Sequence, residues 1–478
     1  MPIGKLTIYG NVDLLLLSRI RMNTKLLRQK ILDLAIRGKL TQQLKSDGNT
    51  ADLLKEISSA SHPERSAKGA KSKDPGTIIP LDKSEAPFEI PANWEWVRLG
   101  DVASDFQYGS AEKSQVEGKV AVLRMGNINR QGQIDYGDLV YTSNDAEIAK
   151  YLLNKNDVLF NRTNSPEWVG KTAIYKGEIP AIYAGYIIRI RPHFNSDYLN
   201  YLMCSDYERN WSKEVKTDGV HQSNINAQKL IAFAIPLPPL AEQQRIVAKI
   251  EEAFAEIDAI EKNKELLKTH IKQTRQKILD LAIHGKLVPQ NKSDEPASVL
   301  LERITRDNPH YEKLTDVPFE IPASWEWVKY AELVTNISVK NFQVKSSEIQ
   351  PIGTFPVVSQ GQSNIDGFVD DPKKVVHLRF PIVLFGDHTK IVKYIDFDFV
   401  VGADGTKVLE AKSAINPKYL YFMTLNIVEK IEDRGYGRHF ALLSNSLCPL
   451  PPLAEQKRIV DRIEEIFASL DEISLHLV

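Results

Sequence analysis

The chain has 478 residues, 42% of them hydrophobic and 26% charged, and a formal net charge of -1. At about 150 residues per domain this length favours two to four globular units, and the balanced charge argues against a simple basic nucleic-acid binder. No apolar run reaches the roughly 18 residues that a membrane span needs. Two cysteines exclude a disulfide scaffold and a four-cysteine zinc site. We therefore expect a cytoplasmic protein without a signal peptide.

Three segments of the first half recur in the second half almost letter for letter. The offsets between the copies fall from 247 to 231 to 213 positions, so the inserts between the repeated segments differ in length. The pairs are RQKILDLAIRGKL at 28–40 with 275–287, PFEIPANWEWV at 87–97 with 318–328, and PLPPLAEQQRIV at 236–247 with 449–460. A repeated frame therefore carries two inserts, which show no convincing sequence match to each other.

The N-terminal part of the frame, residues 1–57, predicts half of a long helix. Residues 1–17 have no counterpart in the repeat, so they are an extension or translation begins near Met22. Residues 58–86 are rich in Ser, Lys, Gly and Pro, which predicts a flexible linker. The apolar seam of this half-helix includes Leu27, Ile31 and Leu34.

Residues 87–237 predict a first mixed α/β domain with short strands. We expect strands at Val120–Arg124, Val158–Phe160, Lys171–Tyr175 and Tyr186–Arg191, and a helix at Tyr198–Cys204. Arginine suits guanine edges, whereas asparagine and glutamine suit adenine. Any one polar loop has an ordinary explanation, but here several such loops occur together. The candidate DNA contacts are Arg124, Asn127, Asn129, Arg130, Arg162, Asn164, His221, Gln222 and Asn224.

Residues 238–304 predict the central long helix. Apolar residues recur at heptad spacing for about five heptads, which is typical of a coiled-coil seam. Pro239 suits a helix start and Gly285 a C-terminal cap. At 1.5 Å per residue, a helix over 240–284 would be roughly 70 Å long. The seam residues are Ile246, Ile250, Ile257, Ile260, Leu267, Ile271, Ile278 and Leu281.

A second linker at 305–317 precedes a second mixed α/β domain at 318–450. We expect strands at Phe355–Val358, Pro381–Phe385, Ile391–Tyr394 and Phe399–Val401, and a helix at Pro417–Leu425. The candidate DNA contacts in its loops are Ser359, Gln360, Gln362, His388, Lys390, Lys407, Arg434, Tyr436, Arg438 and His439.

Residues 451–478 predict the other half-helix. The chain stops at the equivalent of position 265, close to where the N-terminal copy takes over. We therefore predict an α/β protein in which a long antiparallel coiled-coil helix pair separates the two domains, with a pseudo-two-fold internal repeat and a circular organisation. The seam of this half-helix includes Ile459, Ile463, Ile466, Leu470 and Ile473.

Catalytic signatures are incomplete. Residues 165–172 lack the first glycine of a P-loop, and a strand-like segment follows them. Asp398, Glu410 and Lys412 loosely suggest a nuclease set without supporting context. No histidine cluster has metal-ligand spacing, so we expect no catalytic residue and no metal site. A self-sufficient nuclease or methyltransferase and a coiled-coil scaffold that binds no DNA are the rival interpretations.

The motifs taken in order resemble the specificity subunit (HsdS) of type I restriction-modification systems. They are PxxWEWVxLGDV, LRMGNI at 123–128, NDVLFNRTNS at 156–165, PLPPLAEQ and LDLAIxGKL, and the likeness runs from Thr24 to Leu475. The resemblance implies that each insert is a target recognition domain for half of a bipartite DNA site.

The same resemblance implies partners and chemistry in trans. Two modification subunits would use S-adenosylmethionine to methylate adenine, and restriction subunits would use ATP and Mg for cleavage. This chain would be a non-catalytic subunit that binds double-stranded DNA and no cofactor. The alternative is the specificity subunit of a related methyltransferase system outside type I.

Overall fold

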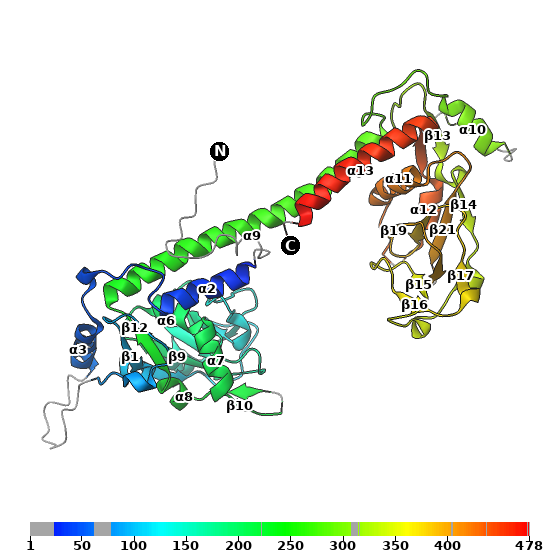
Figure 1. Cartoon of the computed structure of the whole chain (residues 1–478). Coiled ribbons are helices and arrows are strands. Elements are labelled where there is room, and N and C mark those ends of the chain that lie inside the picture. Colours follow the sequence, from blue (N-terminus) through cyan, green and yellow to red (C-terminus); the bar gives the residue numbers. More distant parts are fainter. Residues whose placement is uncertain are drawn as a thin grey trace, which may run out of the picture. The chain divides into compact units, whose positions relative to one another are not determined.

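The computed structural model describes residues 23–61, 78–220, 222–306, 314, 316–402, 405–435, 437–475 and 477. The chain divides into two compact units, Met1–Asn263 and Lys264–Val478. The long helix α9 (Leu240–Ile283) begins in the first unit and ends in the second (Figure 1). The predicted helix over 240–284 is therefore confirmed.

Two small sheets form the domain of the first unit that the sequence predicts to be a recognition domain, in the orders β2-β9-β5-β7 and β4-β3-β8. Alternate residues of a strand face opposite sides. Val158 and Phe160 accordingly join the core beside the frame, and Leu159 joins the core between the sheets. The strands are β2 (Ala103–Tyr108), β3 (Val120–Leu123), β4 (Val140–Thr142), β5 (Val158–Asn161), β7 (Thr172–Ile174), β8 (Ala181–Tyr183) and β9 (Ile187–Pro192).

Short helices and a small ribbon complete this domain. The ribbon has the order β10-β11-β6. The elements are α4 (Leu99–Val102), α5 (Asp145–Tyr151), β6 (Thr163–Asn164), α6 (Ser196–Met203), α7 (Asp206–Val215), β10 (Thr217–Asp218), β11 (Ser223–Asn224) and α8 (Ala227–Ile231).

The second unit contains two sheets in the orders β14-β21-β18-β19 and β16-β15-β20-β17. Val383 of β18 joins the core beside the frame, whereas Leu384 joins the core between the sheets. The elements are β14 (Val334–Ile337), β15 (Phe355–Val358), β16 (Gly367–Val369), β17 (Val375–Val376), β18 (Ile382–Gly386), β19 (Val392–Ile395), β20 (Phe399–Val401), β21 (Thr406–Ala411), α11 (Pro417–Lys430) and α12 (Phe440–Asn445).

The two recognition domains share one topology despite their unlike sequences. Strands β2, β9, β5 and β7 correspond to β14, β21, β18 and β19, and every neighbouring pair is antiparallel. Parallel pairing joins β3 to β8 and, equivalently, β15 to β20. The inserts therefore differ in sequence but share this core topology, whereas β17 and the ribbon β10-β11-β6 each belong to one domain among the described residues. Sequence comparison missed this because many different apolar residues can fill the same alternating pattern.

A two-stranded neck connects each recognition domain to the frame. β1 (Glu95–Arg98) pairs with β12 (Ala234–Leu237), and β13 (Glu326–Lys329) pairs with β22 (Leu447–Leu450). The tryptophans of both WEW segments are buried, so they are packing residues.

One buried carboxylate ties each neck to a frame helix. Trp94 Nε1 donates to Glu242 at 2.8 Å, and Gln43 Nε2 donates to the same carboxylate at 2.5 Å. In the second unit, Glu455 accepts from Trp325 at 3.0 Å and from Gln290 at 2.5 Å. The pairs keep the sequence offsets of the repeat, so the repeat preserves contacts as well as letters.

The frame helices pair in an antiparallel manner within each unit. Arg28 of α2 (Thr24–Ile36) pairs with Asp258, while the later Asp47 pairs with the earlier Arg245. In the second unit, Arg275 pairs with Asp471 of α13 (Leu453–Leu475), and Arg458 pairs with Asp294. Each half of α9 thus has its own short partner helix.

Burial of the seam is deepest beside the recognition domains and declines along the helices. Ile246, Ile250, Ile257, Ile271, Ile278, Ile31, Ile459 and Ile463 are buried. Ile260, Leu281, Leu27, Leu34, Ile466 and Leu470 are partly buried. Leu267 and Ile473 are 38% and 43% exposed, so the seam is less continuous than five regular heptads imply.

The linkers differ in extent from those expected. α3 (Thr50–Ser61) continues into the predicted linker 58–86, because Leu53, Leu54 and Ile57 anchor it in the core. Residues 62–77 of that linker lie outside the described residues, as do 307–313 and 315 of the second. α10 (Ala297–Thr305) is the counterpart of α3, and Gly285 has the positive φ expected of the cap after α9.

We predict that Ile257→Asp destabilises the first unit by about 3 kcal/mol or more. Ile257 is only 2% exposed and lies in the apolar core, so the substitution would bury a carboxylate there. Ala259→Asp puts the same group on the exposed face of α9 and should change stability by less than about 0.5 kcal/mol. Urea unfolding measures both, and equal stability of the two variants would contradict the burial of this seam.

Candidate nucleic-acid interface

Several loops of the first recognition domain meet at one edge of its sheets. β3 and β8 are parallel, so the chain leaves both at the same edge. The Ala184 amide donates to the Leu123 carbonyl at 2.9 Å, and the Gly185 amide donates to Ser110 at 2.6 Å. We call residues 108–110, 124–130, 162–171, 184–186 and 222–224 the first loop edge.

Arg162 lies near the middle of the first loop edge, directly after β5. Its guanidinium stacks on the Tyr108 ring at 4.7 Å and donates to the Gly185 carbonyl at 3.1 Å. Its backbone amide donates to the carbonyl of Tyr186, and both tyrosines are at least 40% exposed. The edge therefore presents aromatic faces beside a guanidinium, a combination suited to nucleic acid.

The loop after β3 carries a buried asparagine, Asn127, and a partly exposed arginine, Arg124. Asn127 is buried, and its side chain donates to the carbonyls of Asp135 and Asp138 and accepts from the Arg124 amide. Asn129 accepts from two amides of its own turn. Arg124 forms an ion pair with Asp138 at 2.9 Å, with 39% of its side chain exposed. Asn127 thus shapes the loop that carries Arg124.

The ribbon brings Asn164 and Asn224 together, because β6 and β11 are paired. Asn224 Nδ2 donates to Thr163 Oγ1 at 2.7 Å, whereas Asn164 Oδ1 accepts from the Ser165 amide. Gln222 is exposed beside them, and His221 lies outside the described residues.

Trp168 is the third exposed aromatic residue named at this edge, and the sequence interpretation included neither it nor the two tyrosines among the candidate DNA contacts. Trp168 is 49% exposed, and the cations of Arg130 and Lys171 lie over its ring at 5.1 and 5.3 Å. Lys171 Nζ also donates to the Met125 carbonyl at 2.8 Å, which links this loop to the one after β3. A lone tryptophan in the polar stretch 161–171 was the available signal.

A second loop edge forms at the same topological place in the second domain. β15 and β20 are parallel, and the chain leaves them beside the end of β18. Gln360 accepts from the His388 amide at 3.2 Å and from Thr389 Oγ1 at 2.8 Å. We call residues 359–363, 386–390, 405–407 and 433–440 the second loop edge; Tyr436 lies outside the described residues.

Four cations belong to the second loop edge. Lys390 Nζ lies 3.7 Å from Asp433, and Lys407 Nζ lies over the Phe440 ring at 5.4 Å. Arg434 and Arg438 are exposed.

The other predicted contacts of this edge differ in exposure. Gln362 is exposed, while Ser359, Gln360 and His388 are partly buried. His439 is fully buried and bonded inside the domain, so its role is internal.

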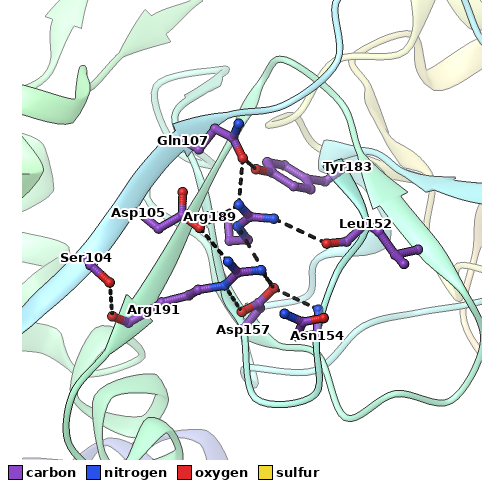
Figure 2. A network of polar contacts seen from close by, with 9 residues as sticks. All are labelled: Ser104, Asp105, Gln107, Leu152, Asn154, Asp157, Tyr183, Arg189 and Arg191. Atoms are coloured by element: carbon purple, nitrogen blue, oxygen red, sulfur yellow. Dashed lines mark hydrogen bonds and ion pairs between the residues drawn. The ribbon is translucent and has the colours of Figure 1, made fainter. Parts of the chain in front are cut away.

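A buried charge cluster lies at the opposite end of the first domain's strands. Arg189 pairs with Asp105 at 2.5 Å, and Arg191 pairs with Asp157 at 2.8 Å (Figure 2). Asp157 precedes β5, whereas Arg162 follows it, so the cluster is not part of the loop edge. The two arginines and two aspartates pair with one another, and they hold β2, β9 and the start of β5 together.

Comparison with known proteins gives the family. A model described as the type I restriction modification DNA specificity domain matches residues 91–269 and 322–475, well over half of the chain. The chain belongs to this family. Its members are non-catalytic recognition subunits, so this specificity subunit is not itself an enzyme.

Curated relatives agree with the family match. The type I restriction enzyme EcoAI specificity subunit of Escherichia coli is 23% identical over 98% of this chain and 91% of its own length. The EcoEI specificity subunit of Escherichia coli is 24% identical over 70% of this chain and 64% of its own length.

A solved structure confirms the fold class. It comes from a study of complex assembly and conformational transition of the type I R-M system, and is 20% identical with a TM-score of 0.54. The match covers 82% of this chain and 94% of that one.

Membrane-spanning helices and metal-binding clusters are absent from the described ranges of this specificity subunit. No helix there combines the length and apolar character needed to cross a membrane. Nor does any group of His, Cys, Asp and Glu there have the arrangement of a metal site.

An ionisable group lies beneath the first loop edge of the specificity subunit. Burial raises the pKa of Glu208 from 4.5 to about 8, against the opposing effects of Ser212, Arg130 and Arg209. Its carboxylate accepts from Ser212 Oγ at 2.5 Å. Gly170 comes so close that a Cβ there would lie 3.0 Å from Glu208 Oε1.

We predict that stability falls as pH rises from about 4.5 to about 8, because the unfolded chain then loses a proton that folded Glu208 keeps. Glu208→Gln should remove roughly 2 kcal/mol or more of this decline. Urea unfolding between pH 5 and pH 9 measures it, with Glu214→Gln, on the exposed face of α7, as the control. Identical pH profiles for the wild type and Glu208→Gln would contradict this assignment.

Proposed function

We propose that this specificity subunit reads an asymmetric, bipartite DNA site, with one half assigned to each recognition domain. The frame separates the two halves and docks two modification subunits, which methylate adenine. The observation that carries this proposal is the pair of loop edges, which occupy the same topological place but present different polar residues. Two loop edges with the same backbone support but different polar side chains are suited to recognise two different half-sites.

The proposed recognition domains span 87–237 and 318–450, with the conserved frame at 1–57, 238–304 and 451–478. The first strand of each neck ends at Arg98 or Lys329, and the second strand begins at Ala234 or Leu447. Residues 99–233 and 330–446 are therefore the exchangeable parts.

The exposed and partly buried polar residues of each edge are the proposed readers. Among the candidates from the sequence, those of the first edge are Arg124, Asn129, Arg130, Arg162, Asn164, Gln222 and Asn224, and those of the second are Ser359, Gln360, Gln362, His388, Lys390, Lys407, Arg434 and Arg438. Asn127 and His439 support them from inside, and His221 and Tyr436 remain sequence-based candidates.

The charge balance supports assembly with partners. Residues 98–235 contain 16 basic and 16 acidic residues, and residues 329–447 contain 14 and 13. Recognition therefore relies on local patches, and the partners would supply much of the phosphate affinity. We propose weak DNA binding by the chain alone and tight binding in the complex.

The chemistry belongs to the partners in this proposal. Adenine N6 is reached only when the base leaves the stack, so a modification subunit with S-adenosylmethionine flips the base while this chain holds the site. Restriction subunits that use ATP and Mg would cleave unmodified DNA, and the complex would work in the cytoplasm.

Mapping methylated adenines in cells with and without this chain tests the whole proposal. A bipartite motif that disappears with the chain supports it, and an unchanged map overturns it. A related methyltransferase system outside type I would give the same motif without ATP-dependent cleavage.

We predict that Arg124→Ala weakens discrimination at one half-site only and Arg438→Ala at the other, each by about 10- to 100-fold. Methylation of duplexes with single-base changes in either half measures this. Lys176→Ala and Arg379→Ala remove exposed or partly exposed cations beyond the opposite strand ends and serve as controls. Equal losses at both halves would contradict the division of labour.

We predict that replacing residues 99–233 by a copy of 330–446 gives a chain that recognises the second half-sequence twice. The two necks have equivalent register, because Trp96 lies opposite Pro236 and Trp327 lies opposite Pro449. Adenine mapping reads the outcome. Retention of the original first half-sequence would show that the insert does not read it.

A further inference from the structure

Asp387 joins three segments of the second loop edge although its side chain is almost fully buried. Residue 387 is 3% exposed and follows β18 directly. Its amide donates to the Gly405 carbonyl at 2.7 Å, and its Oδ1 accepts from the Phe440 amide at 2.7 Å. The segments that end in Asp387, begin at Gly405 and lead into α12 are therefore held at one point.

The same residue holds the ring and the backbone of His439 in place. The Asp387 carbonyl accepts from the His439 amide and from its Nδ1, both at 2.9 Å. His439 Nε2 accepts from the Arg434 amide at 3.1 Å. A carbonyl cannot donate, so the proton in the contact with Asp387 lies on Nδ1 of His439. Asp387 thereby determines the course of the turn that carries Arg434.

The carboxylate also faces a cation of the edge. Asp387 Oδ2 lies 3.9 Å from Lys407 Nζ, whose side chain is 31% exposed. Lys390 is three residues further along and pairs with Asp433 of the same turn. Because Asp387 itself is covered, it can affect DNA only through the groups that it holds. Rigid support of this kind keeps recognising groups in a productive geometry.

The first domain places a different residue at this point. Ladder register aligns Gly386, opposite Thr406, with Asn161, opposite Ile187, so Asp387 corresponds to Arg162. One domain thus presents a candidate reader where the other has a buried support. A change at Asp387 should accordingly affect one half-site.

We propose that Asp387 is a positioning residue on which specificity for the second half-site depends. This inference rests on the proposed function. Asp387→Ala removes the acceptor for Phe440 and the charge facing Lys407, whereas Asp387→Asn keeps an acceptor and removes only the charge.

The test uses the chain assembled with its modification subunits, and methylation of duplexes with one base changed in either half. The second half is the one retained when residues 99–233 are replaced. We expect Asp387→Ala to reduce discrimination there by about tenfold or more and Asp387→Asn by about threefold. Discrimination at the first half should stay within about twofold in both variants.

Asp396→Ala is the control, since Asp396 is exposed beyond the other end of the β18–β19 pair. Wild-type discrimination at the second half in both Asp387 variants, or equal loss at both halves, overturns the inference alone. A wild-type complex without sequence preference overturns the proposed function. If Asp387→Ala fails to assemble, Asp387→Asn decides, with its unfolding temperature compared with that of the wild type.

Discussion

The buried carboxylates of Glu242 and Glu455 fix each recognition domain to the frame. Neither residue is more than 1% exposed, and a covered carboxylate is tolerated only when donors satisfy it. The indole of a WEW tryptophan and a glutamine amide supply those donors in each unit. The direction of the neck, and with it the position of the loop edge relative to its frame helix, follows from this bond.

Each recognition domain places its proposed readers on a rigid support. The four-stranded sheet is covered on both faces, by the frame core on one side and by the second sheet on the other. Loops that leave parallel strands then converge at one edge, where buried polar groups such as Asn127 and Asp387 shape them. Because the overall charge is balanced, the proposed recognition depends on this local geometry and not on a general electrostatic field.

Much of the frame could be predicted from the sequence. The predicted central helix differs from α9 by one residue at its C-terminal end. The strands predicted from apolar runs at Phe355–Val358 and Phe399–Val401 have the same bounds in the structure. The candidate DNA contacts were harder to predict, because a polar side chain in a loop can either face solvent or form hydrogen bonds inside the loop. Asn127 and His439 do the latter, and Trp168 gave too weak a signal on its own.

The repeat, the helices of the frame, the mixed α/β class and the resemblance to specificity subunits can all be derived from the amino-acid sequence. These depend on local periodicity and on identical letters, which one chain displays directly. The folded structure was needed to show that both inserts share a core topology, which loops meet, and which polar groups are covered. Those properties depend on contacts between residues far apart in the chain, and unlike side chains can make equivalent contacts.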